Sequence, residues 1–167
     1  MEGNWDTRGG KVAKDWWYID IIWAVLYTDA MNSKQKGSIA VAQCIAKLYK
    51  LGFEVLLPIG DRNPYDLVFD DGKKLNKVQV KFAGKRSRGG YRAGLRVTGG
   101  NQSFNYAKKY NKDAFDYLFV YSEDGRSYLI KWNDIEIRNE IKIDYQVYKK
   151  YLVWNTRGGR AANRTRL

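Results

Sequence analysis

Hydrophobic and polar residues alternate along one short stretch near the middle of the chain. Residues 65–69 and 75–82 are rich in β-branched and aromatic residues, and turn-forming residues occupy positions 70–73 between them. This pattern predicts a β-hairpin. Along its second strand a period of two places the apolar residues on the core face and the polar residues on a working face. The apolar set is Val78, Val80 and Phe82, and the polar set is Lys77, Gln79 and Lys81.

The length of the turn sets which residues of the two strands face each other. A two-residue loop over residues 71–72 and a four-residue loop over residues 70–73 both place Asp66 opposite Lys77. Directly paired residues lie on the same face of a sheet. We therefore expect Asp66 on the polar face of the hairpin.

The polar face then combines a carboxylate, an amide and an ammonium group from Asp66, Gln79 and Lys81. Hard cations such as Mg²⁺ take oxygen ligands from carboxylates, amides and backbone carbonyls. The carbonyl of Val80, between Gln79 and Lys81, supplies the third kind of oxygen. This patch predicts a metal site, and the alternative is a solvated polar face with ordinary surface lysines.

An amphipathic helix is predicted before the hairpin, from an N-cap at Ser33 to a stop at Gly52. Residues 53–57 form an apolar run that we interpret as a central strand, interrupted by Glu54, an edge charge or a weak candidate for a metal ligand. The helix face is expected to contain Val41, Ile45 and Leu48, with Ala42 and Tyr49 beside them.

Beyond the hairpin, alternation over residues 91–98 predicts a strand with one arginine-bearing face, suited to a two-stranded ribbon. Residues 101–112 are expected to form a short helix or a loop. Residues 116–122 and 127–132 predict a second hairpin that continues the same sheet. Residues 135–151 are consistent with a strand followed by a helix, or with an oligomer contact.

The composition removes several kinds of catalytic site. The chain has no histidine, which excludes Ser-His and Cys-His nucleophile systems and histidine-based metal sites. Its one cysteine, Cys44, excludes a disulfide framework and suits a reducing cytosol, and a small core residue on a helix is the simpler interpretation. Any catalysis must rest on carboxylates, amides, lysines and a metal ion.

A formal net charge of +12 over 167 residues indicates a polyanionic partner, either nucleic acid or an acidic membrane surface. Between Asp71 and Asp113 there are twelve basic residues and no acidic one. We expect this segment to contact DNA; the alternative is a solvated basic loop held near DNA only by its charge. The predicted DNA-binding residues are Lys85, Arg86, Arg88, Tyr91, Arg92 and Arg96.

The sequence Pro-Tyr-Asp at residues 64–66, twelve intervening residues and Gln-Val-Lys at residues 79–81 resemble the core of the PD-(D/E)XK nucleases. The resemblance covers about residues 31–151 and extends to the small intron-encoded homing endonucleases. Gln79 replaces the usual acidic residue of the motif. Val41 stands where the family often has a helix glutamate, so that Asp66 is the one carboxylate left. Weaker metal binding should follow from the missing charges.

The resemblance implies an α/β fold with a PD-(D/E)XK restriction-endonuclease-like core, in which helices flank a mixed central sheet. It implies a Mg²⁺-dependent, site-specific double-strand DNA endonuclease, with Asp66, Gln79 and Lys81 as catalytic residues and Asp66, Gln79 and Val80 as metal ligands. The alternatives are a catalytically inactive DNA-binding protein on the same fold, and a Holliday-junction-resolvase or restriction-type nuclease.

Cutting both strands requires two sites, so we expect a homodimer or homotetramer. We expect a cytoplasmic protein, or an organellar one if the intron is organellar, without a membrane partner. Residues 31–152 are the expected endonuclease domain, residues 1–30 an extension and residues 153–167 a basic tail that strengthens DNA binding.

Overall fold

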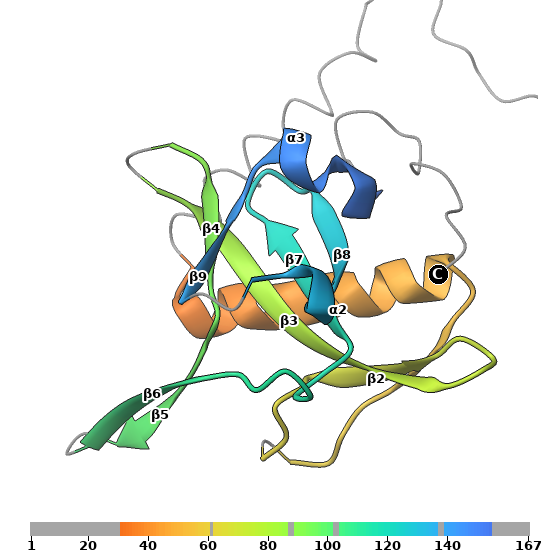
Figure 1. The fold of residues 1–167 in the computed structure, drawn as a ribbon, viewed down its shortest axis with the longest axis horizontal. Coiled ribbons are helices and arrows are strands. Elements are labelled where there is room, and N and C mark those ends of the chain that lie inside the picture. The colour runs from red at the N-terminus through yellow and green to blue at the C-terminus, as the bar shows by residue number, and fades with distance from the viewer. Residues whose placement is uncertain (1–30, 61, 87–88, 102–103, 137–138, 155–167) are drawn as a thin grey trace, which may run out of the picture. The chain divides into compact units, whose positions relative to one another are not determined.

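The structure is a computed structural model that describes residues 31–60, 62–86, 89–101, 104–136 and 139–154 (Figure 1). The chain divides into two units, Met1–Asn32 and Ser33–Leu167, and the description below concerns the second.

A mixed sheet forms the centre of this unit (Figure 1). Its strand order is β1-β2-β3-β7-β8-β10, in which β3 and β7 are parallel and the other neighbours are antiparallel. The predicted mixed sheet is thus confirmed, with the first hairpin at its centre. The strands are β1 (Glu54–Leu56), β2 (Leu67–Asp70), β3 (Leu75–Lys85), β7 (Tyr117–Ser122), β8 (Ser127–Lys131) and β10 (Leu152–Trp154).

The remaining strands extend this core on one side. The far end of β3 pairs with β4 (Tyr91–Gly94), and β4 pairs in turn with β9 (Glu140–Ile143). A separate ribbon consists of β5 (Arg96–Asn101) and β6 (Phe104–Lys109), which Figure 1 shows projecting from the body of the fold. The helices are α2 (Ser33–Lys50) and α3 (Tyr145–Tyr148), with 3₁₀ turns η1 (Trp132–Asp134) and η2 (Lys149–Tyr151).

Helix α2 packs on one face of the sheet and ends where the sequence predicts. Gly52 adopts a φ of 87°, the left-handed conformation that commonly follows a helix and favours glycine. The buried stripe differs from the expected one: Ala42 and Tyr49 are exposed. The fully buried apolar positions are Ala40, Cys44 and Leu48, with Val41 and Ile45 half-buried beside them.

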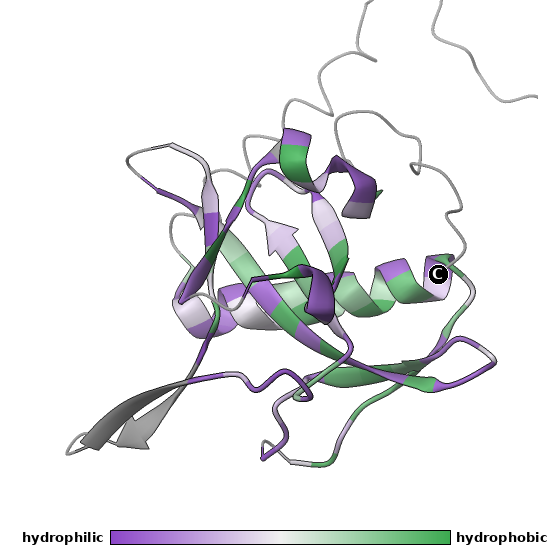
Figure 2. Ribbon diagram, in the orientation of Figure 1, coloured by the Kyte–Doolittle hydropathy of each residue, from purple (hydrophilic) through white to green (hydrophobic). Residues whose placement is uncertain are grey.

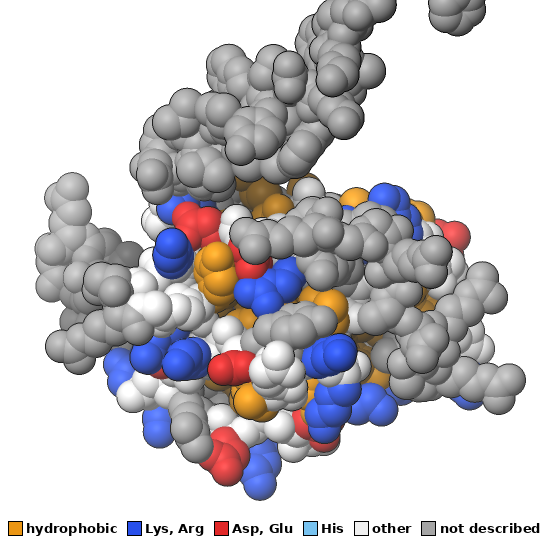
Figure 3. Space-filling model, turned by 90° about the horizontal axis from the view of Figure 1, so that it is seen from above, with side chains coloured by type: hydrophobic (Ala, Val, Ile, Leu, Met, Phe, Trp, Pro, Cys, Tyr) orange, Lys and Arg blue, Asp and Glu red, His pale blue; other side chains and the backbone are white. Residues whose placement is uncertain are grey.

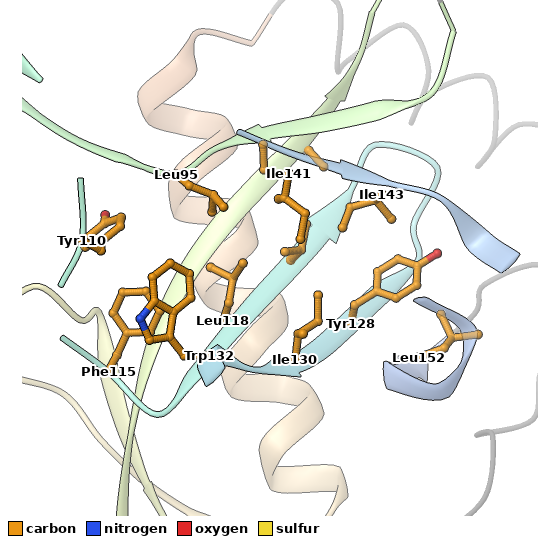
Figure 4. Packing of buried hydrophobic residues seen from close by; sticks show 13 residues of the cluster. Leu95, Tyr110, Phe115, Leu118, Tyr128, Ile130, Trp132, Ile141, Ile143 and Leu152 are labelled. Atoms are coloured by element: carbon orange, nitrogen blue, oxygen red, sulfur yellow. The ribbon is translucent and has the colours of Figure 1, made fainter. Parts of the chain in front are cut away.

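Two hydrophobic clusters lie on opposite faces of the sheet. Along β7, Tyr117 and Phe119 join the cluster beneath α2, whereas Leu118 and Val120 join the cluster on the other face. A strand buried on both faces is typical of parallel pairing inside an α/β core. In the neighbouring strand β3, hydrophilic and hydrophobic residues alternate instead (Figure 2). The second cluster also includes side chains from β4, β8 and β9 (Figure 4).

Two predicted elements are wrong. Residues 53–57 do not form a central strand: β1 spans Glu54–Leu56 at the edge of the sheet, where Leu56 and Leu57 are exposed. A short apolar run does not distinguish a strand buried on both faces from an edge strand that buries one. Residues 101–112 contain a strand, β6, because they find an antiparallel partner in β5.

The later elements agree with the prediction. Strands β7 and β8 form the second hairpin and continue the central sheet through the parallel pairing of β3 with β7. The carboxylates of its turn are structural: Asp124 pairs with Arg126, and Glu123 accepts a hydrogen bond of 2.7 Å from the backbone N–H of Lys85. Strand β9 and helix α3 give the strand-then-helix order at residues 140–148.

We expect Phe69→Ala to destabilise the protein by about 3 to 5 kcal/mol, because Phe69 is fully buried against Phe53 and Tyr117 and its removal leaves a cavity. Equilibrium unfolding in guanidinium chloride measures this loss. Leu75→Ala is the matched control: Leu75 begins the neighbouring strand, is 58% exposed and should change stability by less than about 0.5 kcal/mol. Equal losses in both variants would contradict the assigned cluster.

Candidate active site

The hairpin of β2 and β3 brings Asp66 to the polar face of β3 in a register that differs from the predicted one. Leu67 pairs with Val78, so continuing the ladder places Asp66 beside Gln79 and not beside Lys77. The predicted face is nevertheless correct, because the shift of two residues preserves the parity of the pairing.

The turn explains the different register. Four residues, 71–74, lie outside the ladder, one position later than expected. Asp71 organises them, since one of its oxygens accepts hydrogen bonds of 2.9 Å from the backbone N–H groups of Lys73 and Lys74. Its other oxygen accepts a bond of 2.9 Å from the side chain of Asn76. Side-chain bonds of this kind are typical of aspartate in turns, and they do not follow from the alternation of the strands.

Asp66 is tied to β3 by three hydrogen bonds. Its backbone N–H donates to the carbonyl of Val78 at 2.9 Å. Its Oδ2 accepts from the backbone N–H of Val80 at 2.7 Å and from Nε2 of Gln79 at 2.6 Å. The carboxylate therefore has a fixed position beside the centre of the strand.

Lys81 lies on the same face as Asp66. Gln79 and Lys81 are alternate residues of one strand, so the side chain that bonds to Asp66 and the lysine point to the same side of the sheet. The positive charge of Lys81 also acts on Asp66, where it lowers the pKa of the carboxyl group. The structure thus brings together the three side chains that the sequence analysis singled out.

Taken together, the surroundings of Asp66 disfavour its charged form. Burial is the largest influence and raises the pKa of its carboxyl group above the ordinary value. The hydrogen bond from Val80, the charge of Lys81 and the hydrogen bond from Gln79 oppose that rise without cancelling it. Asp66 is therefore a half-buried carboxylate that a bound cation would stabilise.

The oxygens around Asp66 suit a hard cation. The NH₂ group of Gln79 lies 2.6 Å from Oδ2 of Asp66 and 3.2 Å from the carbonyl oxygen of Val80, so a positively polarised group bridges these two oxygens. Turning the amide over would present Oε1 of Gln79 to the same region. Carboxylate, carbonyl and amide oxygens together are the kind of donor set that Mg²⁺ takes.

The site contains few charged ligands. Within the described part of the chain there is no group of three or more Asp, Glu, His or Cys side chains able to hold a metal ion. Val41 packs against the cluster under α2. Glu54 of β1 lies opposite Asp70 in the strand ladder, at the end of β2 that is far from Asp66. Burial, aided by the charge of Asp66, raises the pKa of the Cys44 thiol, which is a neutral core residue as expected.

The predicted DNA-binding residues lie where β3 ends and along β4. Lys85 and Arg86 are exposed, and the backbone N–H of Arg86 donates to the carbonyl of Gly90 at 3.2 Å. Figure 3 shows lysine and arginine side chains spread over the face it presents, with acidic side chains among them. Arg88 lies outside the described residues.

Three of these residues are held by neighbouring side chains. The guanidinium group of Arg126 lies over the half-buried ring of Tyr91, 5.6 Å from its centroid. Arg92 forms an ion pair with Glu140, and Nε of Arg96 donates to Oδ1 of Asn139 at 3.0 Å.

Sequence analysis missed Tyr110. The ammonium group of Lys81 lies 5.3 Å from the centroid of this buried ring, which belongs to the segment after β6. No spacing in the sequence signals the contact, because it depends on how residues 110–116 return from the ribbon to β7.

The sequence profile of the PD-(D/E)XK endonuclease family matches residues 31–150. The chain belongs to this family. Among solved structures, the bacterial homing endonuclease I-Ssp6803I is 35% identical and aligns with a TM-score of 0.62, over 68% of this chain and 79% of that chain. The Holliday junction resolvase Hjc of Archaeoglobus fulgidus is 16% identical with a TM-score of 0.41, over 69% and 88% of the two chains. No match is found among curated proteins.

Membership of the PD-(D/E)XK family confirms the predicted fold class, the predicted resemblance and the prediction of a DNA endonuclease. The domain boundaries and the roles of the individual site residues stay predictions.

No helix in the described ranges is both long enough and apolar enough to span a membrane.

We expect Asp66→Asn to raise the thermal unfolding temperature at about pH 8 in the presence of a chelator. Because the folded-state pKa of Asp66 is raised, folding stability falls as pH increases from the ordinary aspartate pKa to the raised one. Asparagine carries no charge and its oxygen can still accept both hydrogen bonds. The difference should vanish at pH values below the ordinary aspartate pKa, and calorimetry across the pH range measures it. A variant less stable than wild type at pH 8 would contradict the electrostatic assignment.

Proposed function

We propose that this PD-(D/E)XK endonuclease is a Mg²⁺-dependent, site-specific enzyme that cuts both strands of duplex DNA, as a homing endonuclease. The observation that carries the proposal is the placement of Asp66, Gln79 and Lys81 on one face of β3, with Asp66 bonded to Gln79 at 2.6 Å. The 35% identity to a bacterial homing endonuclease supports the same assignment.

Asp66, the carbonyl of Val80 and Oε1 of Gln79 would hold the metal ion. Bound Mg²⁺ would make a water molecule more acidic and neutralise charge on the phosphate. Gln79 has to release its hydrogen bonds to Asp66 and Val80 to offer its oxygen. With one carboxylate in the set, the metal affinity should be low compared with a site of two or three carboxylates.

Lys81 contributes a positively charged side chain to the proposed active site. Beside the scissile phosphate, Lys81 would orient the attacking water as an ammonium group or take its proton as a neutral amine. In its charged form it would offset the negative charge that develops in the transition state. The influence of Lys81 on the pKa of Asp66 supports its closeness to the proposed metal ligands.

The basic residues beyond Lys81 form the proposed DNA-binding surface. They continue directly from the strand of the active site through Lys85 and Arg86 into β4, so that a duplex bound there passes close to Lys81. Glu140 and Asn139 hold Arg92 and Arg96 in place, which reduces the entropy lost when arginines bind phosphate or bases. The ribbon of β5 and β6 has the width that a DNA groove accepts.

A homodimer or homotetramer would provide the two active sites that a double-strand break requires. One site per subunit, related by a two-fold axis, matches the antiparallel strands of the duplex.

A second candidate function is DNA binding without cleavage. It is favoured by one observation: within the described residues no three acidic, histidine or cysteine side chains meet at a possible metal site. Binding that depends strongly on salt, with no cleavage in Mg²⁺ or Mn²⁺, would support this alternative.

We expect Lys81→Met and Asp66→Asn each to lower the rate of DNA cleavage by at least about 100-fold, because one removes the catalytic charge and the other the metal carboxylate. DNA affinity in a chelating buffer should stay within about threefold of wild type. The measurement is Mg²⁺-dependent linearisation of a plasmid that carries a cleavage site selected with the wild-type enzyme from a library of duplex sequences.

Lys131→Ala serves as the control for this experiment, since Lys131 is an exposed lysine at the end of β8 and should leave cleavage unchanged. Cleavage at the wild-type rate by both active-site variants would refute the proposed mechanism.

Arg86→Ala should weaken DNA binding and reduce the slope of log K against log salt by about one, because one phosphate contact is lost. Fluorescence anisotropy at several salt concentrations measures the slope, again with Lys131→Ala as the matched control. An unchanged slope for Arg86→Ala would exclude this residue from the interface.

A further inference from the structure

Lys81 has an aromatic neighbour that the proposed function does not explain. Its ammonium group lies 5.3 Å from the centroid of the Tyr110 ring, within the distance at which a cation is attracted to the face of an aromatic ring. Tyr110 is 6% exposed and Lys81 is half-buried. A cation–π contact strengthens as its partners lose water, so this contact is stronger than one on an open surface.

The ring of Tyr110 has a fixed orientation. It stands edge-on to Phe115, with centroids 5.0 Å apart and planes at 78°, and edge-on to Trp132 at 6.1 Å and 88°. The rings of Phe115 and Trp132 lie 4.4 Å apart. Figure 4 shows Tyr110, Phe115 and Trp132 gathered at one end of the cluster. The two supporting rings thus prevent Tyr110 from rotating away from Lys81.

The backbone next to Tyr110 is also anchored. Nε1 of Trp132 donates a hydrogen bond of 3.1 Å to the carbonyl of Asn111, and the backbone N–H of Ala114 donates to the same carbonyl at 3.2 Å. Because Tyr110 directly follows β6, this anchor fixes the base of the β5–β6 ribbon and the ring under Lys81 together.

Other lysines of the structure also lie over rings, but their positions differ. Lys77 lies 5.6 Å from the ring centroid of Tyr65 and is exposed. Lys150 lies 4.7 Å from that of Tyr151 and is exposed too. Only at Lys81, among the described pairs, does a buried ring meet a half-buried lysine on the face that contains Asp66. A lysine has four rotatable side-chain bonds, so a fixed partner is needed to confine its ammonium group.

We propose that Tyr110 is a positioning residue for catalysis: its ring face holds the ammonium group of Lys81 beside Asp66, in the place from which it acts on the scissile phosphate. The proposal rests on the proposed function for its catalytic consequence. The contact between ring and ammonium group exists without metal or DNA, so it is testable separately.

The first test measures single-turnover cleavage by variants of Tyr110. Tyr110→Phe retains the ring face and should cleave within about twofold of wild type. Tyr110→Leu should lower the single-turnover rate constant by roughly 3- to 30-fold, with DNA affinity in a chelating buffer unchanged. Tyr151→Leu removes a half-buried ring that lies next to a different lysine, away from the site, and should cleave like wild type.

Fluorinated phenylalanines at position 110 separate a cation–π role from a packing role. Successive fluorine atoms weaken the negative face of the ring while its size changes little, so the rate constant should fall stepwise with each fluorine. A rate constant that is constant across this series, or wild-type cleavage by Tyr110→Leu, would overturn the proposal.

The second test does not require cleavage. In the metal-free protein the ring current of Tyr110 should shift the NMR signals of the Lys81 ε-methylene protons upfield. The shift should persist in Tyr110→Phe and disappear in Tyr110→Leu. Absence of the shift in wild type overturns the inference about Tyr110. The shift together with no cleavage by wild type contradicts the proposed function and leaves the contact standing.

Discussion

The organisation of the protein depends on one carboxylate and the strand that binds it. Oδ2 of Asp66 accepts hydrogen bonds from the backbone of Val80 and the side chain of Gln79. Without such partners, a half-buried carboxylate would cost on the order of several kcal/mol in its charged form and would tend to take up a proton instead. Even with them, burial keeps the pKa of Asp66 raised. The hairpin therefore maintains a group that costs stability, as functional sites often do.

The two hydrophobic clusters make that arrangement possible. Val78 and Val80 anchor one face of β3 to α2, while Leu118 and Val120 of the parallel neighbour β7 build the cluster on the other face. The central strand is thus fixed from both sides, which fixes the backbone positions from which Gln79 and Lys81 extend. The aromatic group that includes Tyr110 continues the second cluster up to Lys81.

The sequence correctly predicted those features of the fold that depend on residues close together in the chain. The period of two gave the correct face for Asp66, and the glycine at position 52 gave the end of α2. The register of the hairpin failed because the side chain of Asp71 builds a turn that alternation does not encode. The edge position of β1, the strand β6 and the contact of Lys81 with Tyr110 depend on pairing between distant segments, which a single sequence does not specify.

Anomalous X-ray diffraction from crystals of the protein–DNA complex soaked in Mn²⁺ would locate the metal ion without relying on activity. We expect an anomalous peak within coordinating distance of both the Asp66 carboxylate and the Val80 carbonyl, on the face of β3 that carries Lys81. A metal bound elsewhere on the protein, with these two oxygens unliganded, would contradict the proposed metal site.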